Sequence, residues 1–125
     1  ASAAVMADGC GLSRQNLLSA SELVKVLVYM NRAQYHVDFI NSLARPGEPG
    51  TLQYRFLGLP AGISLHAKTG SLSRVRSLSG YLSKDGQPRL VFSLICNNNQ
   101  GPQEEVHRTI DNLVQLFALY LKEKK

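Results

Sequence analysis

The dipeptide Asp85-Gly86 separates two strand-like segments, and it constrains the fold more than any other feature of this chain. Asp-Gly supplies the left-handed backbone that a tight β-hairpin needs. Strands are predicted on either side of it, at Val75–Ser83 and Arg89–Cys96. A further strand is predicted at Ile63–Thr69, where apolar and polar residues alternate. Three successive strands of this kind predict an antiparallel meander.

Three helices are expected around this sheet. Ser19 and Glu22 form a capping box at the start of an amphipathic segment that runs to about Asn31. A second, short helix precedes Pro46, which stops it. The last helix begins at Pro102 and carries one apolar stripe, formed by Val106, Ile110, Leu113, Val114, Phe117 and Leu121.

The strand from Arg89 to Cys96 is apolar on both faces, which predicts that helices cover the sheet on both sides. The 125 residues suffice for one domain with a real core, since 44% of them are apolar. Residues 45–62 form a connector rich in glycine and proline. Connectors of this length within a compact domain more often have a function than serve only as a link. The expected fold class is α+β, an antiparallel sheet flanked by helices with the C-terminal helix packed on it.

The tetrapeptide Lys68-Thr69-Gly70-Ser71 follows the alternating strand pattern and is the main candidate for a functional site. The alternation places Lys68 on the polar face of the strand. Gly70 would let another backbone lie close against the strand, because glycine has no Cβ. On these four residues alone, an ordinary edge strand that runs into a Gly-Ser turn is the simpler explanation.

Four motifs in a fixed order favour a ligand site instead. They are Asp8-Gly9-Cys10-Gly11-Leu12-Ser13-Arg14-Gln15-Asn16, then Gly50-Thr51-Leu52 with Arg55, then Ala67-Lys68-Thr69-Gly70-Ser71-Leu72, then Leu78-Ser79-Gly80-Tyr81. Together they resemble the C-terminal part of the transpeptidase domain in the D-alanyl-D-alanine carboxypeptidase/endopeptidase family, the class C low-molecular-mass penicillin-binding proteins. The resemblance runs from about Val5 to the final helix. One departure is Cys10, where the family usually has serine.

The resemblance implies both a fold and a chemistry. Penicillin-binding proteins have a five-stranded antiparallel sheet flanked by helices, with Lys-Thr-Gly on the strand that borders the active site. A serine attacks the D-Ala-D-Ala carbonyl and forms an acyl-enzyme that water resolves. By this resemblance Lys68 is catalytic, and Thr69, Gly70 and Ser71 bind the substrate. The hydroxyls of Thr69 and Ser71 would bind its terminal carboxylate, and the N–H of Ser71 would belong to the oxyanion hole.

The nucleophile is expected to lie outside these 125 residues. The family also needs Ser-x-x-Lys and Ser-x-Asn motifs. No serine from Ser2 to Ser93 is followed by lysine at the third position or by asparagine at the second. We therefore expect the C-terminal portion of a D,D-peptidase domain, inactive alone. The stretch Ala1-Ser2-Ala3-Ala4 is typical of an artificial junction or a cut point rather than of a natural start.

Arg14 and the two cysteines each have two interpretations. In the family the position of Arg14 lies at the cleft, so Arg14 is either a contact for an anionic substrate or a structural arginine that holds its loop together. Cys96 lies in an apolar run and is expected to be buried. An exported protein could pair it with Cys10, but two cysteines do not form a disulfide framework, so free thiols are expected.

The net charge of +5 does not predict a nucleic-acid partner. Lys122, Lys124 and Lys125 lie at the end of a helix, where they complement its dipole. No aromatic residues interleave with the basic ones, as platforms for base stacking would require. The three histidines show no ligand spacing, so neither a metal site nor a cofactor is expected.

The partners that the resemblance implies are peptidoglycan peptides and, for the full-length protein, β-lactams. No apolar run is long enough to span a membrane, and no signal peptide is visible. Because the family is exported, the expected location is the periplasm, the cell envelope or the medium. The alternative function is a noncatalytic cell-wall or partner-binding module that kept the fold and lost the nucleophile. A Ser-x-x-Lys motif upstream would favour the enzyme.

Overall fold

The computed structural model describes residues 4–125. They form α1 (Ala20–Arg32), α2 (His36–Ser42), β1 (Ile63–Leu72), β2 (Val75–Lys84), β3 (Gln87–Cys96) and α3 (Gln103–Glu123). The predicted α+β class with an antiparallel meander is confirmed. Of the stretch Ala1-Ser2-Ala3-Ala4, predicted to be a junction or a cut point, the first three residues lie outside the described residues.

The strands form one antiparallel sheet in the order β1-β2-β3. The turn between β2 and β3 contains Asp85 and Gly86, whose φ angles of 52° and 78° are both positive. This is the left-handed pair that a type I′ hairpin requires, so the predicted Asp-Gly hairpin is confirmed. Within the described residues β1 and β3 are the two edges of the sheet.

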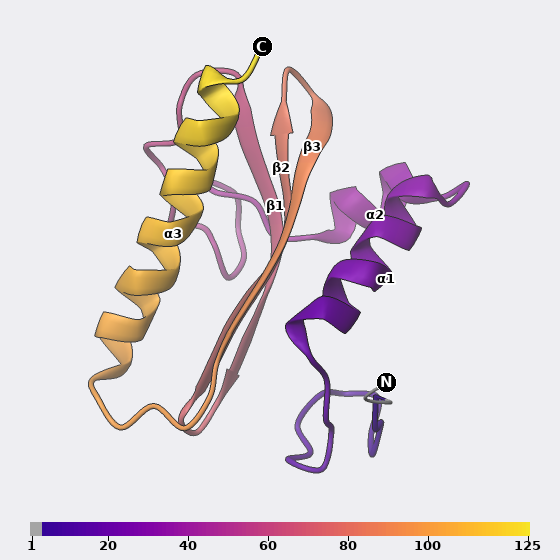
Figure 1. Ribbon diagram of the computed structural model, residues 1–125, viewed down its shortest axis with the longest axis vertical. Coiled ribbons are helices and arrows are strands. Elements are labelled where there is room, and N and C mark those ends of the chain that lie inside the picture. Colours follow the sequence, from indigo (N-terminus) through magenta and orange to yellow (C-terminus); the bar gives the residue numbers. More distant parts are fainter. Residues whose placement is uncertain (1–3) are drawn as a thin grey trace.

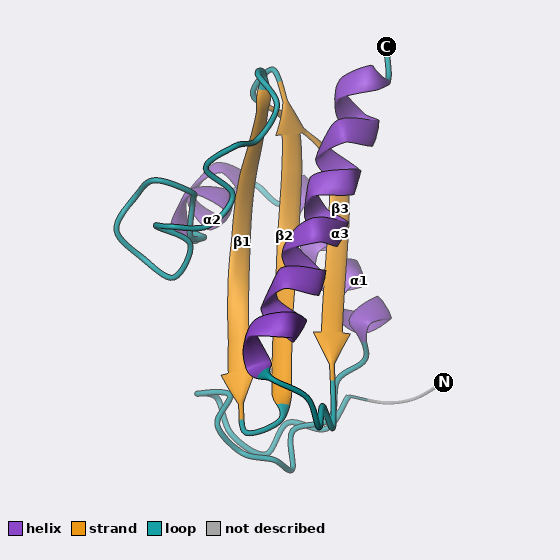
Figure 2. Ribbon diagram, turned by 90° about the vertical axis from the view of Figure 1, so that its left-hand side faces the viewer, coloured by secondary structure: helices purple, strands orange, loops and turns teal. Residues whose placement is uncertain are grey.

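Helices cover both faces of the sheet, as the apolar third strand predicts (Figures 1 and 2). α3 lies along one face, which we call the α3 face, and α1 and α2 lie against the other, which we call the α1 face. The predicted capping box begins α1: the Ser19 hydroxyl accepts from the Glu22 N–H at 3.2 Å, and the Glu22 carboxylate accepts from the Ser19 N–H at 2.7 Å.

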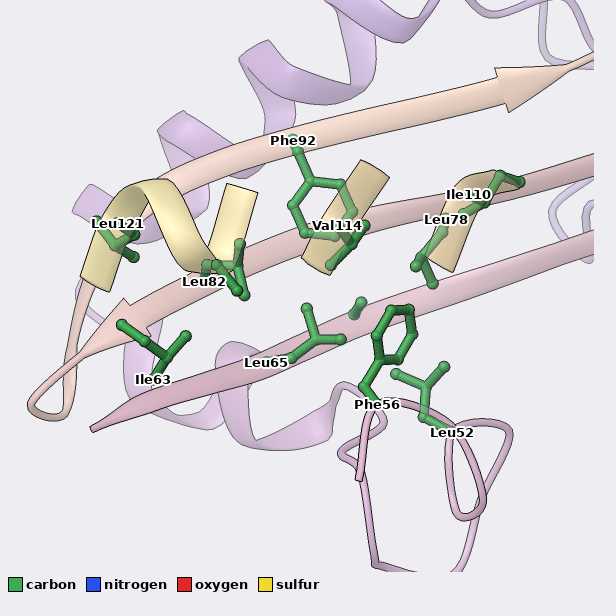
Figure 3. Close-up of a cluster of buried hydrophobic side chains, with 12 residues drawn as sticks. Leu52, Phe56, Ile63, Leu65, Leu78, Leu82, Phe92, Ile110, Val114 and Leu121 are labelled. Atoms are coloured by element: carbon green, nitrogen blue, oxygen red, sulfur yellow. The ribbon is translucent and has the colours of Figure 1, made fainter. Parts of the chain in front are cut away.

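The main core lies between α3 and the sheet (Figure 3). Successive side chains of a strand point to opposite faces, and Ile63, Leu65 and Ala67 of β1 are all buried on the α3 face. The connector between α2 and β1 adds Leu52 and Phe56 to the same core. The alternation predicted for β1 is confirmed, and it determines which side chains of its last residues reach this face.

The buried stripe of α3 differs slightly from the predicted one. Leu113 is 37% exposed, and Phe117 is only partly buried, with its ring centre 6.3 Å from that of Phe92. The residues of α3 that meet the sheet form one row, in which neighbours are four, four and three positions apart in the chain. Leu113, one residue before Val114, lies beside this row. The fully or nearly fully buried residues of α3 are Ile110, Val114, Ala118 and Leu121.

A smaller cluster on the α1 face joins Tyr81 of β2 to Leu27 of α1 and Ile40 of α2. Both cysteines are free thiols, as predicted; Cys10 is exposed, and Cys96 is half-buried rather than buried. Among the described residues, no helix combines the length and the apolar character needed to cross a membrane.

Candidate active site

One end of the free edge of β1 is open. The connector meets this edge at a single point, where Ala44 and Ala67 exchange two backbone hydrogen bonds of 3.0 and 3.1 Å. In an antiparallel strand every second residue directs its N–H and C=O to the same edge. The N–H and C=O groups of Thr69 and Ser71 therefore point to this edge as well. No strand of the described chain pairs with them there, so an extended ligand could.

Lys68 places a positive charge at this open edge. Its side chain starts from the α1 face and is exposed. Its ammonium donates a hydrogen bond to the backbone carbonyl of Thr69 at 2.6 Å, and that carbonyl points to the edge. Neither of the two ion pairs in the described chain involves Lys68. Its charge is therefore available to an anionic group from outside.

Thr69 and Ser71 direct their side chains to the α3 face, opposite to that of Lys68. There they border a small cavity of about 170 Å³ between β1, the connector and the first turns of α3. Hydroxyl and amide donors of the same two residues thus lie at the edge and at the cavity mouth. The other residues that give polar groups to the wall are Thr51, Arg55, Arg76, Ser77 and His107.

Arg55 is held in the cavity wall by Asp111 of α3. Its Nε donates to Oδ2 of Asp111 at 3.2 Å, and its Nη2 pairs with Oδ1. The guanidinium also lies 5.3 Å from the ring centre of Phe56. A two-point arginine–carboxylate pair has a specific geometry, so it fixes the connector on α3 and balances the charge of Arg55.

Gly70 is required by its cross-strand neighbour. Gly70 pairs with Ser77 of β2, and a Cβ at position 70 would lie 2.3 Å from the Ser77 hydroxyl oxygen. The space beside Gly70 is therefore already filled from within the sheet. This contact explains the glycine without a ligand, and its role in substrate approach stays a prediction.

The loop from Asp8 to Asn16 is closed by side-chain hydrogen bonds. The Asp8 carboxylate accepts from the N–H of Gly11 at 2.8 Å, from the N–H of Ser13 at 2.7 Å and from the Asn16 amide at 2.9 Å. The bond from Asn16 above all, with those from the two backbone groups, holds the pKa of Asp8 below its ordinary value. Asp8 and Asn16, the two ends of the first motif, therefore stabilise the conformation of this loop.

Arg14 projects from this loop to the site. Its Nη2 donates to the backbone carbonyl of Ser73 at 3.0 Å, in the turn that follows Lys-Thr-Gly-Ser. Arg14 thus connects the loop to the end of β1, which is the structural interpretation of this residue. It is also exposed, and its contact with an anionic substrate stays a prediction.

Two histidines near the site have a lowered pKa. Burial, and then the charge of Arg45, lower the pKa of His66, which shares the α1 face with Lys68. Burial, and then the charges of Arg55 and Arg76, lower the pKa of His107 at the cavity. Both rings are therefore neutral at neutral pH, and the positive charge of the site comes from its lysine and arginines.

Comparison with known proteins shows the family. The sequence profile of the D-Ala-D-Ala carboxypeptidase 3 (S13) family matches residues 1–119. The chain belongs to this family. The match includes the Asp8–Asn16 loop, the connector, the whole sheet and most of α3, so every element that builds the open edge and the cavity is an element of the family.

The chain is also similar to curated proteins that are named as carboxypeptidases. The chain is 37% identical over 121 residues to penicillin-sensitive carboxypeptidase A of Dictyostelium discoideum, covering 91% of this chain and 23% of that protein. It is 38% identical over 104 residues to D-alanyl-D-alanine carboxypeptidase of Actinomadura sp. (strain R39), covering 78% and 19%. It is 36% identical over 110 residues to carboxypeptidase DacB of Mycolicibacterium smegmatis, covering 81% and 23%. The chain thus spans between 19% and 23% of the length of these three relatives.

Sequence reasoning did not identify Arg76, His107 and Asp111 as neighbours of the Lys-Thr-Gly-Ser segment of this family member. The alternation of β2 does place Arg76 on the same face as buried Leu78. His107 and Asp111 are four residues apart, so they share one side of α3. These spacings orient the side chains on each element. The packing of α3 on the sheet then brings His107 and Asp111 to the site.

Proposed function

We propose that this chain forms one wall of the active site of a serine-type D-Ala-D-Ala carboxypeptidase/endopeptidase that acts on peptidoglycan stem peptides. The observation that carries the proposal is the open end of the β1 edge, where the ammonium of Lys68 donates to the outward-pointing carbonyl of Thr69 and the N–H of Ser71 points to the same edge. Membership of the S13 family supports it. The names of two relatives, a penicillin-sensitive carboxypeptidase and a D-alanyl-D-alanine carboxypeptidase, also support it.

In the proposed mechanism the substrate lies extended along the open edge. A serine from a part of the protein outside these 125 residues attacks the carbonyl between the two D-alanines and forms an acyl-enzyme. The carbonyl oxygen becomes an oxyanion and accepts a hydrogen bond from the N–H of Ser71. Such a donor is typically worth about 2.7–4 kcal/mol in the transition state. The terminal D-alanine leaves, and water then hydrolyses the acyl-enzyme.

The polar side chains of the segment bind and orient this substrate. The hydroxyls of Thr69 and Ser71 donate to its terminal carboxylate at the cavity mouth. The charge of Lys68 attracts the carboxylate during approach and stabilises the ionised groups around the nucleophile. Peptidoglycan lies outside the cytoplasmic membrane, so the proposal locates the full-length protein in the periplasm, in the cell envelope or in the medium.

The test uses the full-length protein and a fluorescent penicillin. The wild type is expected to form a stoichiometric covalent adduct, measured on a denaturing gel and by mass spectrometry. Lys68→Ala is expected to lower the second-order acylation rate by about 10²–10³-fold, the effect of removing one polar group from such a site. Thermal melting of Lys68→Ala should match that of the wild type, because an exposed lysine contributes little stability.

Lys25→Ala is the matched control, since Lys25 is an exposed lysine of α1. It should be acylated at the wild-type rate. The 125-residue chain alone should form no adduct. An adduct on that chain would place the nucleophile within it and contradict the proposal. A full-length wild type that forms no adduct would favour the noncatalytic binding module instead.

A further inference from the structure

We propose that Arg76 makes this site selective for substrates that end in a free carboxylate. The inference rests on the proposed peptidase function and adds a residue that determines specificity. Neither the Lys-Thr-Gly-Ser segment nor the other three motifs contain Arg76. Three features of Arg76 support this role: its position opposite Ser71, its unbalanced charge and its unpaired hydrogen-bond donor.

Arg76 lies directly across the β1–β2 ladder from Ser71. Side chains of such a pair point to the same face, with Cβ atoms about 4.5–5.5 Å apart. Arg76, Thr69 and Ser71 therefore line one cavity of about 170 Å³. That volume is below the range of about 300–1,000 Å³ for pockets that take drug-sized ligands. The cavity thus fits a small terminal group rather than a peptide.

The charge of Arg76 is the one positive charge of the cavity wall that has no acidic partner in the described chain. Arg55 is paired with Asp111. His107 is neutral at neutral pH, because burial and the two guanidiniums lower its pKa. Lys68 starts from the opposite face of the strand. An anion that enters the cavity therefore meets the charge of Arg76.

Hydrogen bonds hold the guanidinium of Arg76 in place and leave one of its N–H donors unpaired. Its Nη1 donates to the backbone carbonyls of Leu72 and Val75 at 2.7 and 2.8 Å, which fixes the group against the β1–β2 turn. Its Nε is buried and has no hydrogen-bond partner in the described chain. An unpaired buried donor costs free energy. The planar fork of a guanidinium matches a carboxylate. Arg76 lines the cavity beside Thr69 and Ser71, so a carboxylate bound there would meet this guanidinium.

The experiment compares two substrates of the full-length protein: an N-acylated tripeptide ending in D-Ala-D-Ala, and the same peptide with a C-terminal amide. The wild type should cleave the acid with the higher kcat/KM. Arg76→Gln should reduce this preference by about 10- to 100-fold, the effect of losing charge-assisted hydrogen bonds. The change should come from a higher KM for the acid, while the kinetics of the amide stay unchanged.

Two further variants control for charge and for folding. Arg76→Lys keeps the charge and should retain part of the preference. Arg74→Gln removes a neighbouring exposed arginine that does not line the cavity, and should behave as the wild type. Thermal melting of each variant shows whether the protein is as stable as the wild type.

Several outcomes would overturn the inference. An unchanged acid-to-amide ratio in Arg76→Gln would show that another group holds the carboxylate, while the peptidase function stands. An equal loss of activity on both peptides would show that Arg76 acts only by holding the turn. A wild type that cleaves neither peptide and binds no penicillin would overturn the proposed function itself, and the inference with it.

Discussion

The hydroxyl of Tyr81 donates a hydrogen bond to the backbone carbonyl of Leu27 at 2.6 Å, and this buried contact holds α1 on the sheet. Tyr81 has no exposed surface. It ends the Leu-Ser-Gly-Tyr motif on β2, the strand that pairs with β1 along its whole length. Burial raises the pKa of Tyr81 to about 12, so the hydroxyl stays protonated and donates at physiological pH.

Replacing Tyr81 by Phe should lower the free energy of unfolding by about 0.5–1.5 kcal/mol at neutral pH, the net value of one hydrogen bond. The folded-state pKa of about 12 lies above the ordinary value of 10.0, so the folded protein favours the protonated phenol. The advantage of the wild type over Tyr81→Phe is therefore complete below pH 10 and is lost as the pH rises toward 12. Urea unfolding of both proteins from pH 8 upward measures it. A difference that stays constant across this range would contradict the assignment.

Gly80→Ala should destabilise the protein strongly, because Gly80 packs against the backbone of β1. A Cβ at this position would lie 2.1 Å from the carbonyl oxygen of His66 and 2.6 Å from Cα of Ala67. Backbone atoms cannot rotate away, so β1 would have to move, at a cost of about 1–3 kcal/mol or more. The measurement is the midpoint of thermal or urea unfolding. Gly9→Ala is the control, since no atom lies within 4 Å of its added Cβ, and it should change the stability by less than about 0.5 kcal/mol.

Gly70→Ala should also destabilise the protein, but this effect should be reversible by a second substitution. The added Cβ would meet the Ser77 hydroxyl oxygen at 2.3 Å, whereas Cβ of Ser77 lies at an ordinary 3.6 Å. Ser77→Ala removes the clashing atom and should restore most of the lost stability, with a coupling of about 0.5–3 kcal/mol in a double-mutant cycle. Additive effects of the two substitutions would mean that the hydroxyl is not the atom that excludes a side chain at position 70.

Breaking the pair between Arg55 and Asp111 should loosen the connector. The two side chains are 21% and 28% exposed, so solvent weakens the interaction. Asp111→Asn is expected to cost about 1 kcal/mol, and the loss should shrink at high salt because the charges are screened. Urea unfolding at two salt concentrations, with Arg55→Gln and the double variant, checks this. Equal losses at both salt concentrations would indicate that the pair contributes by packing and not by charge.

Several features of the fold follow from neighbouring residues and could be predicted. Ser19 and Glu22 cap α1 because their partners are three residues away, and Asp85 and Gly86 form their turn with their own backbone angles. The buried row of α3 could not be predicted in full. Ala118 is fully buried while Leu113 is exposed, because the angle at which a helix meets a sheet depends on the complete packed surface.

The family could be predicted from the sequence alone, because four ordered motifs indicate it, and it is confirmed. The same motifs predict Lys68, Thr69, Gly70 and Ser71 as the residues of the candidate site, and their roles stay a prediction. The alternation of β1 also separates Lys68 from Thr69 and Ser71 on opposite faces.

The tertiary structure alone decided what surrounds this segment. It brings Arg76, His107 and the Arg55–Asp111 pair to one cavity beside Ser71, and among residues 4–125 no strand pairs with the edge beyond Ala67. Arg76 is near Ser71 in the chain, directly across the β1–β2 hairpin, but the other contacts join residues that are far apart in the chain. They arise because burial of the apolar faces of α3, the connector and the sheet forms one core, and no short-range pattern specifies that arrangement.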